Sequence, residues 1–202
     1  MPQTSYQLEP VFGVPGMPFS PAASDVVEAR PAYAAIPFGV AVELVVVAGI
    51  EYVQPLQDST TGGSFAPALF GVSVWDPARE QALPALSPTT GISTYTGYLA
   101  NEMVPVMRSG LIWVLTDSAT QQASWAASWP SLGQVKVWHS STGANFQGVF
   151  TMLAVSATAG AEIDLCPTTI IGRESARQQT YTNGFGATFS IAVVGINLPG
   201  ST

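Results

Sequence analysis

Charged side chains are scarce in this 202-residue sequence, at 9% of all residues, whereas an ordinary soluble domain has about 25%. Six Lys and Arg residues oppose thirteen Asp and Glu residues, which gives a net charge of -7 and leaves no basic patch. Because cations that neutralise phosphates supply most nucleic-acid affinity, we expect no nucleic-acid partner. Hydrophobic residues make up 47%, and this apolar excess must be buried in the fold or against other chains.

Cysteine and histidine occur once each, as Cys166 and His139. A lone cysteine forms no intramolecular disulfide, which favours synthesis in a reducing cytoplasm. Any Cys-His or Ser-His nucleophilic site would need one of these residues, and neither brings a recognisable partner. His139 stands beside a turn signal, and Cys166 follows an apolar run as a small hydrophobe. We therefore predict no catalytic residue, and no enzyme.

Metal and cofactor motifs are missing too. The sequence has no histidine pair, no CxxC and no Asp-x-Asp-x-Asp loop. Glu162 and Asp164, two residues apart, could pair as acid and base with His139 nearby, but a solvated strand face explains this spacing better. The Gly-Phe-Gly at residues 184–186 lacks the lysine and the helix start of a phosphate loop. We predict no metal and no cofactor.

Long hydrophobic runs are absent as well. The longest one, residues 40–50, is interrupted by Glu43 and Gly49 and is shorter than the roughly 18 to 20 residues of a membrane-spanning helix. The first ten residues contain neither a basic nor an apolar segment. We therefore expect no membrane partner and no secretory signal.

Proline is abundant in residues 1–37, at positions 2, 10, 15, 18, 21, 31 and 37. Proline donates no amide hydrogen bond and fixes its own φ, so this segment predicts an extended N-terminal arm that becomes ordered by lying on another surface. Tyr6, Phe12, Met17 and Phe19 are spaced along it as candidate anchors. The arm could wrap its own domain or reach a neighbouring subunit, and the sequence leaves both open.

Residues 38–202 contain short runs of β-branched and aromatic residues separated by Gly, Pro, Ser and Asn. This pattern predicts an all-β domain. The expected architecture is an antiparallel β-barrel or sandwich, and a jelly-roll-like arrangement is one of the options. One short helix is expected at residues 117–125. Strands are expected at residues 40–47, 51–54, 69–75, 134–138, 148–156 and 187–196, and more weakly at 163–165 and 169–171.

Residues 98–114, YLANEMVPVMRSGLIWV, predict a β-hairpin. Residues 104–107 and 111–114 are rich in β-formers, and the link Arg108-Ser109-Gly110 places a glycine where a three-residue hairpin loop needs one. Because both faces of each strand are apolar, we expect this hairpin to be covered on two sides.

The five tryptophans are the remaining candidates for a binding surface. Trp125, Trp129 and Trp138 cluster late in the chain and could form a carbohydrate-stacking platform or an interface anchor. Trp75 and Trp113 lie within strand patterns and are predicted in the core. A core or interface role is favoured over sugar binding, because the polar residues that usually frame a sugar are sparse.

Several separated blocks resemble one family. They are PVFGVPGM (10–17), IPFGVAVE (36–43), FGVSVWDPARE (70–80), YLANEMVPVMRSGLIWV (98–114), GQVKVWHSSTG (133–143) and the terminal strand that ends in INLP (196–199). In this order they resemble the structural cement, or head decoration, proteins of tailed bacteriophages, which are small β proteins on the outside of the capsid. Residues 116–130 depart from the family pattern as an apparent insertion.

The resemblance implies a structural virion protein, made in the host cytoplasm, that binds the outer capsid surface. It would bridge neighbouring copies of the major capsid protein, stabilise the head and associate with copies of itself as a dimer or trimer. The candidate interface residues are Tyr6, Phe12, Met17, Phe19, Trp125 and Trp129. The alternative is a carbohydrate- or receptor-binding β module of the virion that uses the late tryptophans.

Overall fold

The structure is a computed structural model that describes residues 13–19, 25–56, 69–79, 95–116, 136–138, 147–151, 162–164 and 170–197. The elements are β1 (Val26–Pro31), β2 (Ile36–Pro37), β3 (Ala41–Val47), β4 (Ile50–Pro55), β5 (Leu69–Ser73), the 3-10 turn η1 (Pro77–Arg79), β6 (Gly97–Tyr98), β7 (Met103–Thr116), β8 (Lys136–Trp138), β9 (Phe150–Thr151), β10 (Glu162–Asp164), β11 (Ile170–Thr182) and β12 (Thr188–Asn197). Within these residues no helix is long and apolar enough to cross a membrane.

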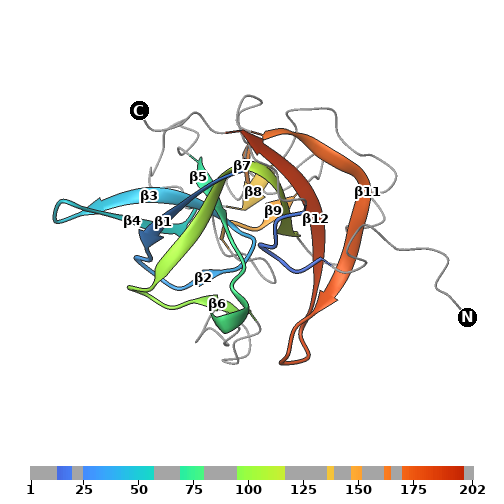
Figure 1. The fold of residues 1–202 in the computed structure, drawn as a ribbon, viewed down its shortest axis with the longest axis horizontal. Helices are drawn as coiled ribbons and strands as arrows, with labels where there is room; N and C mark the ends of the chain where they lie inside the picture. The colour runs from blue at the N-terminus through green and yellow to red at the C-terminus, as the bar shows by residue number, and fades with distance from the viewer. Residues whose placement is uncertain are drawn as a thin grey trace, which may run out of the picture.

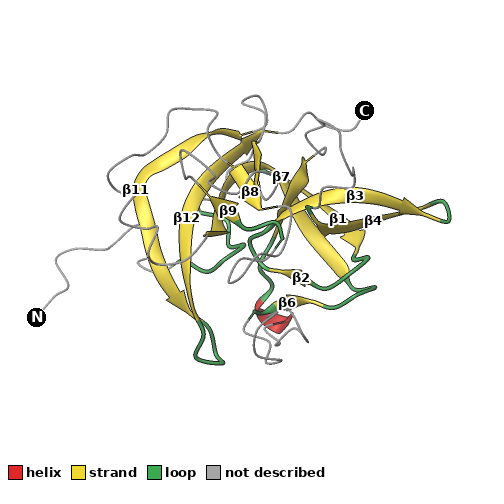
Figure 2. Cartoon of the chain, turned by 180° about the vertical axis from the view of Figure 1, so that it is seen from behind, coloured by secondary structure: helices red, strands yellow, loops and turns green. Residues whose placement is uncertain are grey.

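The strands form one large curled sheet and one small two-stranded sheet, β2 with β6 (Figure 1). The large sheet has the order β10-β8-β9-β7-β5-β3-β4, with β1 and β12 also paired to β7, and β11 paired to β12. Every pair of these strands is antiparallel except β7 with β9. Figure 2 shows the same curled sheet from behind, with strands as nearly all of its regular structure. The all-β prediction is confirmed.

Five of the strands, in the order β7-β5-β3-β4-β1, close into a ring. The closing contact follows β1, where Ala32 bridges to Val53 of β4, and the Tyr33 N–H donates to the Val53 carbonyl at 2.8 Å. The Tyr33 and Tyr52 rings meet edge to face beside this bond, with centroids 5.9 Å apart. A sheet that bonds to itself leaves fewer unpaired backbone groups, so this short contact stabilises the curled form.

Strand β7 shows that the predicted hairpin was wrong. It runs without a turn from Met103 to Thr116, through the Arg108-Ser109-Gly110 segment that predicted the loop. The partner strand of β7 changes at this point, because β1 pairs with residues 103–109 and β12 pairs with residues 109–116. These two strands satisfy the backbone of β7 on either side of the segment, so the chain continues extended. The two-sided burial expected for this stretch is confirmed by its largely buried side chains.

Arg108 is an extra residue in β7. Val27 of β1 lies opposite Met107, and the next residue, Val26, lies opposite Ser109, so Arg108 has no counterpart on β1. This two-against-one register is a β-bulge, which bends a strand and shifts its alternation of side chains by one.

The bulge explains which side chains of β7 share a core. Val106 and Trp113 are an odd number of residues apart, yet both belong to the same buried cluster. Gly110 adopts a φ of 132°, and a Cβ atom there would collide with the Asp25 carboxylate. Glycine is therefore needed beside the bulge, for the same backbone freedom that suggested a turn.

Two buried clusters lie on the two faces of the sheet. The first contains Val42 of β3, Phe70 of β5 and Val106 of β7, within the ring. The second contains Met107 of β7 and Ile196 of β12 on the other face. Burial of each such side chain stabilises the fold by about 1.5 to 3 kcal/mol, so covering both faces absorbs much of the apolar excess of the sequence.

Strands β3 and β4 form a hairpin around Ala48 and Gly49. Val47 pairs with Ile50, so the loop has two residues, and both have positive φ, 51° for Ala48 and 82° for Gly49. This is the type I′ geometry, whose twist matches that of the flanking strands. Both strands were predicted from the sequence, at residues 40–47 and 51–54.

The predicted arm contains regular structure where it is described. Residues 26–31 form β1 against β7, and residues 36–37 form β2 against β6. The boundary between an arm at residues 1–37 and a β domain at 38–202 stays a prediction. The helix expected at residues 117–125 lies outside the described residues.

Two tyrosines that precede β7 are buried. The Tyr95 ring stacks on Phe189 of β12, with centroids 5.0 Å apart, and the Tyr98 hydroxyl donates to the Val74 carbonyl at 2.7 Å. Burial raises the pKa of Tyr95 to about 12. The pKa of Tyr98 is also raised, mainly by burial and further by the Asp76 carboxylate. Both rings therefore favour a protonated hydroxyl in the folded state.

The turn of the β3–β4 hairpin can be improved by substitution. Alanine in a left-handed conformation costs about 1 kcal/mol, and asparagine tolerates it better. Ala48→Asn should raise the free energy of unfolding by about 0.5 to 1 kcal/mol in urea titrations. Ala48→Val, a β-branched residue at positive φ, should lower it. Equal stability of both variants would contradict the type I′ assignment.

The raised tyrosine pKa predicts alkaline sensitivity. The folded state disfavours the ionised ring, so the stabilisation is complete below about pH 10 and is lost as the pH rises toward about 12. For Tyr95 the full effect is at most about 2 to 3 kcal/mol. Tyr95→Phe should lose less stability than the wild type between about pH 8 and about pH 11.5, measured by urea unfolding. An equal loss in both proteins would contradict burial of the hydroxyl.

Candidate interaction surface

Met17 and Phe19, two predicted arm anchors, pack partly buried against the first core cluster of their own domain. The Phe19 N–H donates to the Leu111 carbonyl at 2.8 Å, and the Trp113 N–H donates to the Met17 carbonyl at 3.0 Å. The Phe19 and Trp113 rings meet edge to face at 5.9 Å. The described part of the arm therefore lies on β7 of the same chain, while an interface role for these two residues stays a prediction.

Most other sequence candidates fall outside the described residues. Glu162 and Asp164 lie in β10, opposite Trp138 and Lys136 of β8. Among the described residues no three His, Cys, Asp or Glu side chains gather as a metal site would require. The candidates outside the described residues are Tyr6, Phe12, Trp125, Trp129, His139 and Cys166.

The two tryptophans predicted in the core are both packed there. Trp113 is 3% exposed within the first cluster, and Trp75 is partly buried against the same cluster. Both rings therefore contribute to packing.

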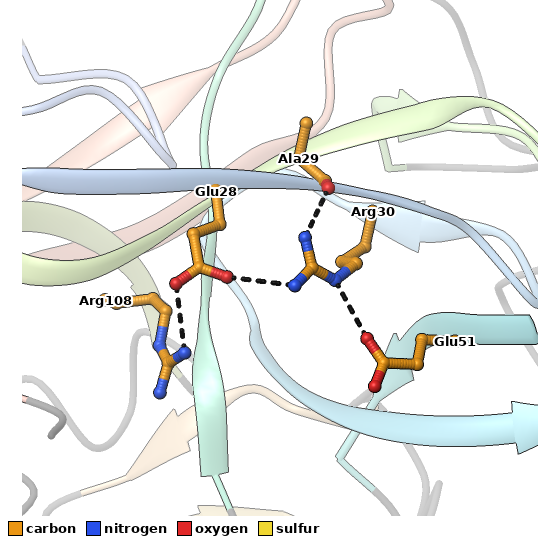
Figure 3. Close-up of polar contacts among 5 residues, drawn as sticks. All are labelled: Glu28, Ala29, Arg30, Glu51 and Arg108. Atoms are coloured by element: carbon orange, nitrogen blue, oxygen red, sulfur yellow. Dashed lines mark hydrogen bonds and ion pairs between the residues drawn. The ribbon is translucent and has the colours of Figure 1, made fainter. Parts of the chain in front are cut away.

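Charged side chains of three strands pair with one another (Figure 3). Glu28 of β1 bonds Arg108 of β7 at 3.0 Å and Arg30 of β1 at 3.2 Å. Arg30 also pairs with Glu51 of β4, at 3.4 Å. Both guanidinium groups lie over the Phe70 ring, 4.6 Å from its centroid for Arg108 and 5.6 Å for Arg30. The charges are compensated internally and the cations also contact an aromatic face.

This charge cluster faces the inside of the ring. Glu28 lies opposite Val106, and Arg30 lies opposite Val104. Both valines belong to the first core cluster, and directly opposite residues of an antiparallel pair share a face. The Arg30–Glu51 pair lies two residues from the closing contact between Ala32 and Val53, so it adds a link between β1 and β4 there.

A second charge cluster surrounds Tyr98. Arg79 of η1 pairs with Glu102 at 2.7 Å and with Asp76 at 3.6 Å. The Arg79 guanidinium lies 5.9 Å from the Tyr98 ring centroid, and the Leu99 N–H donates to Glu102 at 2.8 Å. These ionic groups, like those of the first charge cluster, pair with one another within the chain. Exposed apolar side chains are therefore more available than charged ones for contact with a partner.

Exposed apolar side chains are concentrated at a few places. The β3–β4 hairpin projects from the rest of the fold, and its turn lies far from the other elements (Figure 1). Its outer half carries Leu44, Val46 and Ile50, exposed to 37%, 63% and 52%. The remaining large exposed apolar residues in the described part of the chain are Val26, Val27, Tyr33, Met103 and Phe185.

Phe185 lies at the turn of the β11–β12 hairpin and is 58% exposed. The Asn183 side-chain oxygen accepts hydrogen bonds from the Phe185 and Ala187 N–H groups, both at 3.0 Å. The Asn183 N–H donates to the Ala187 carbonyl at 2.9 Å. The turn is thus internally bonded and holds an aromatic ring in solvent, which suits an anchor for a partner.

Neither of these tips was predicted as an interface. Residues 40–47 were predicted as one strand, and the prediction did not distinguish the inner half, which is buried, from the outer half, which is not. The available signal was the continuous valine run after Glu43, because a strand with one solvated face would alternate apolar and polar residues.

Loss of the charge partner inside the ring should destabilise the fold. Glu28→Gln removes the carboxylate that pairs with the Arg108 side chain, which is 9% exposed, and we expect this to cost about 1 to 3 kcal/mol of unfolding free energy. Glu51→Gln removes the pair to Arg30 on a carboxylate that is 53% exposed, and should cost less than about 0.5 kcal/mol. Urea titrations measure both, and similar losses would contradict the internal placement of Glu28.

Comparison with known proteins identifies the family. A family model described as structural cement protein (E217 gp24/Pam3 gp6) matches residues 1–169. Neither the curated proteins nor the solved structures gave a match. The matched region includes the arm, the ring of strands, all of β7 and the β3–β4 hairpin. The chain belongs to the family of phage structural cement proteins, which gives it a structural role in the virion and associates it with the phage capsid.

Proposed function

We propose that this protein binds the outer surface of the phage head and bridges neighbouring copies of the major capsid protein, so that the head resists internal pressure. Membership of the structural cement family supports this role. The role needs no catalytic step, and none is proposed. Synthesis in the host cytoplasm fits a sequence with a single cysteine.

The arrangement of exposed apolar side chains carries this proposal. The β3–β4 hairpin presents Val46, and the β11–β12 hairpin presents Phe185, exposed to 63% and 58%. The two tips lie well apart in both views (Figures 1 and 2). A protein that bridges two neighbours needs two separate contact surfaces, and two projecting hairpins provide them.

The capsid lattice would strengthen individually weak contacts. A protein held at one point gains a high effective concentration at its second point, so many modest contacts add up over the shell. Association of two or three copies at a local symmetry axis would multiply the contacts again. The predicted interface residues all stay candidates for these contacts: Tyr6, Phe12, Met17 and Phe19 of the arm, and Trp125 and Trp129 of the insertion.

The proposal is tested on heads that lack the protein. Purified protein added back should bind at regular positions in electron-microscopy reconstructions. Because bound copies tie neighbouring capsid proteins together, the temperature at which the heads release DNA should rise by several degrees. Survival of osmotic shock should also increase.

Heads mixed with an unrelated β protein of similar size provide the control. Heads that bind the protein and gain no thermal or osmotic resistance would refute the stabilising role. Absence of binding would refute the capsid-binding role itself.

A further inference from the structure

Residues 44–50, here called the hairpin tip, form a rigid projection. Val47 and Ile50 pair next to the two-residue turn, whose positive φ angles suit a type I′ loop. A preformed hairpin loses little conformational freedom on binding, so most of the apolar contact it makes contributes to affinity.

The hairpin tip carries exposed apolar side chains on both faces, with Glu51 of β4 opposite Val46 on one of them. Leu44 and Val46 alternate along β3 and share one face, while Ile50, opposite Val47, lies on the other. A surface that lies flat on a partner needs only one apolar face. A tip with two apolar faces can bury both only by entering a cleft, between two walls of the partner.

The ionic groups near the tip are already paired. The Gln54 side-chain amide donates to Glu43 at 2.6 Å, and Glu51 pairs with Arg30 at 3.4 Å. No cation of the partner is needed to neutralise these carboxylates. The complementary surface is therefore uncharged and apolar, and binding should depend little on salt.

The exposed area indicates which partner fits. Leu44, Val46 and Ile50 are exposed to 37%, 63% and 52%, which corresponds to on the order of 250 Å² of mostly aliphatic surface. A stable dimer buries roughly 800 Å² on each partner. The exposed apolar area of the tip is too small to hold a dimer together by itself. It suits a partner that the protein also contacts through other surfaces.

We propose that the hairpin tip inserts into an uncharged apolar cleft of the major capsid protein and is one of the contacts that fix this protein to the head. This inference rests on the proposed function and adds the contacting surface and the chemistry of its partner. Val46, the most exposed of its side chains, is the anchor of the contact.

The test compares substitutions at Val46 for binding to heads that lack the protein. Val46→Lys should weaken binding at least about tenfold, because an apolar contact is replaced by a charge that must be desolvated. Val46→Ile, which keeps the side chain apolar, should bind within about twofold of the wild type. Met103→Lys, at an apolar residue that is 52% exposed in β7, is the matched control and should also bind normally.

The folded state should tolerate Val46→Lys, since position 46 lies opposite Glu51 in the hairpin and opposite charges across strands are favourable. Thermal unfolding checks this. If the variant unfolds early, Ile50→Lys and Leu44→Lys, each measured alone for folding and binding, decide the outcome in the same way.

The outcomes separate the two proposals. Wild-type protein that does not bind heads refutes the proposed function. Wild-type and Val46→Lys proteins that bind equally overturn the tip contact and leave the proposed function standing. A dimer in sedimentation experiments that Val46→Lys converts to monomer, with unchanged head binding, assigns the tip to a second copy and also overturns the inference.

Discussion

The backbone pairing of β7 is the interaction on which the rest of the structure depends. This strand bonds β1 along its first half and β12 along its second, and it also meets β5 and β9. Arg108, the extra residue in its middle, lets the first core cluster continue along both halves although the side-chain alternation changes. Without this shift, Trp113 would point away from the cluster that contains Val106.

Much of the fold could be predicted because burial and turn chemistry are local in the sequence. The valine run of β3, the Ala48-Gly49 turn and the apolar β12 each have their own signal. The failure at Arg108-Ser109-Gly110 has a physical cause: a bulge and a hairpin loop both use a glycine with positive φ. What separates them is the partner strand, and β1 and β12 come from opposite ends of the chain. Strand β1 was missed because its single proline and its two charged residues interrupt the run of β-forming residues.

The candidate surface was less predictable than the fold. Aromatic residues drew attention as anchors, yet Phe19 packs on its own domain and Val46, an ordinary strand residue by sequence, is the more exposed. Exposure at residue 46 depends on how far the hairpin extends beyond its neighbours, and β5 pairs only with the inner residues of β3. Such a length difference between strands far apart in sequence is invisible to composition or periodicity. The family, by contrast, was recognisable from sequence blocks and is shown by the family model.

The contact between Tyr33 and Val53 has a consequence for how the protein behaves before assembly. A protein with only 9% charged residues has few charged side chains with which to protect its strand edges from pairing with other copies. Open sheet edges would then act as templates for strand-to-strand polymerisation. Ala32 and Tyr33, which follow β1, bond to Val53 of β4. This contact covers a stretch of the β4 edge to which a strand of another copy could otherwise pair. The protein can thus reach the concentration needed to coat a shell without polymerising through its strand edges, although its sequence is poor in charge.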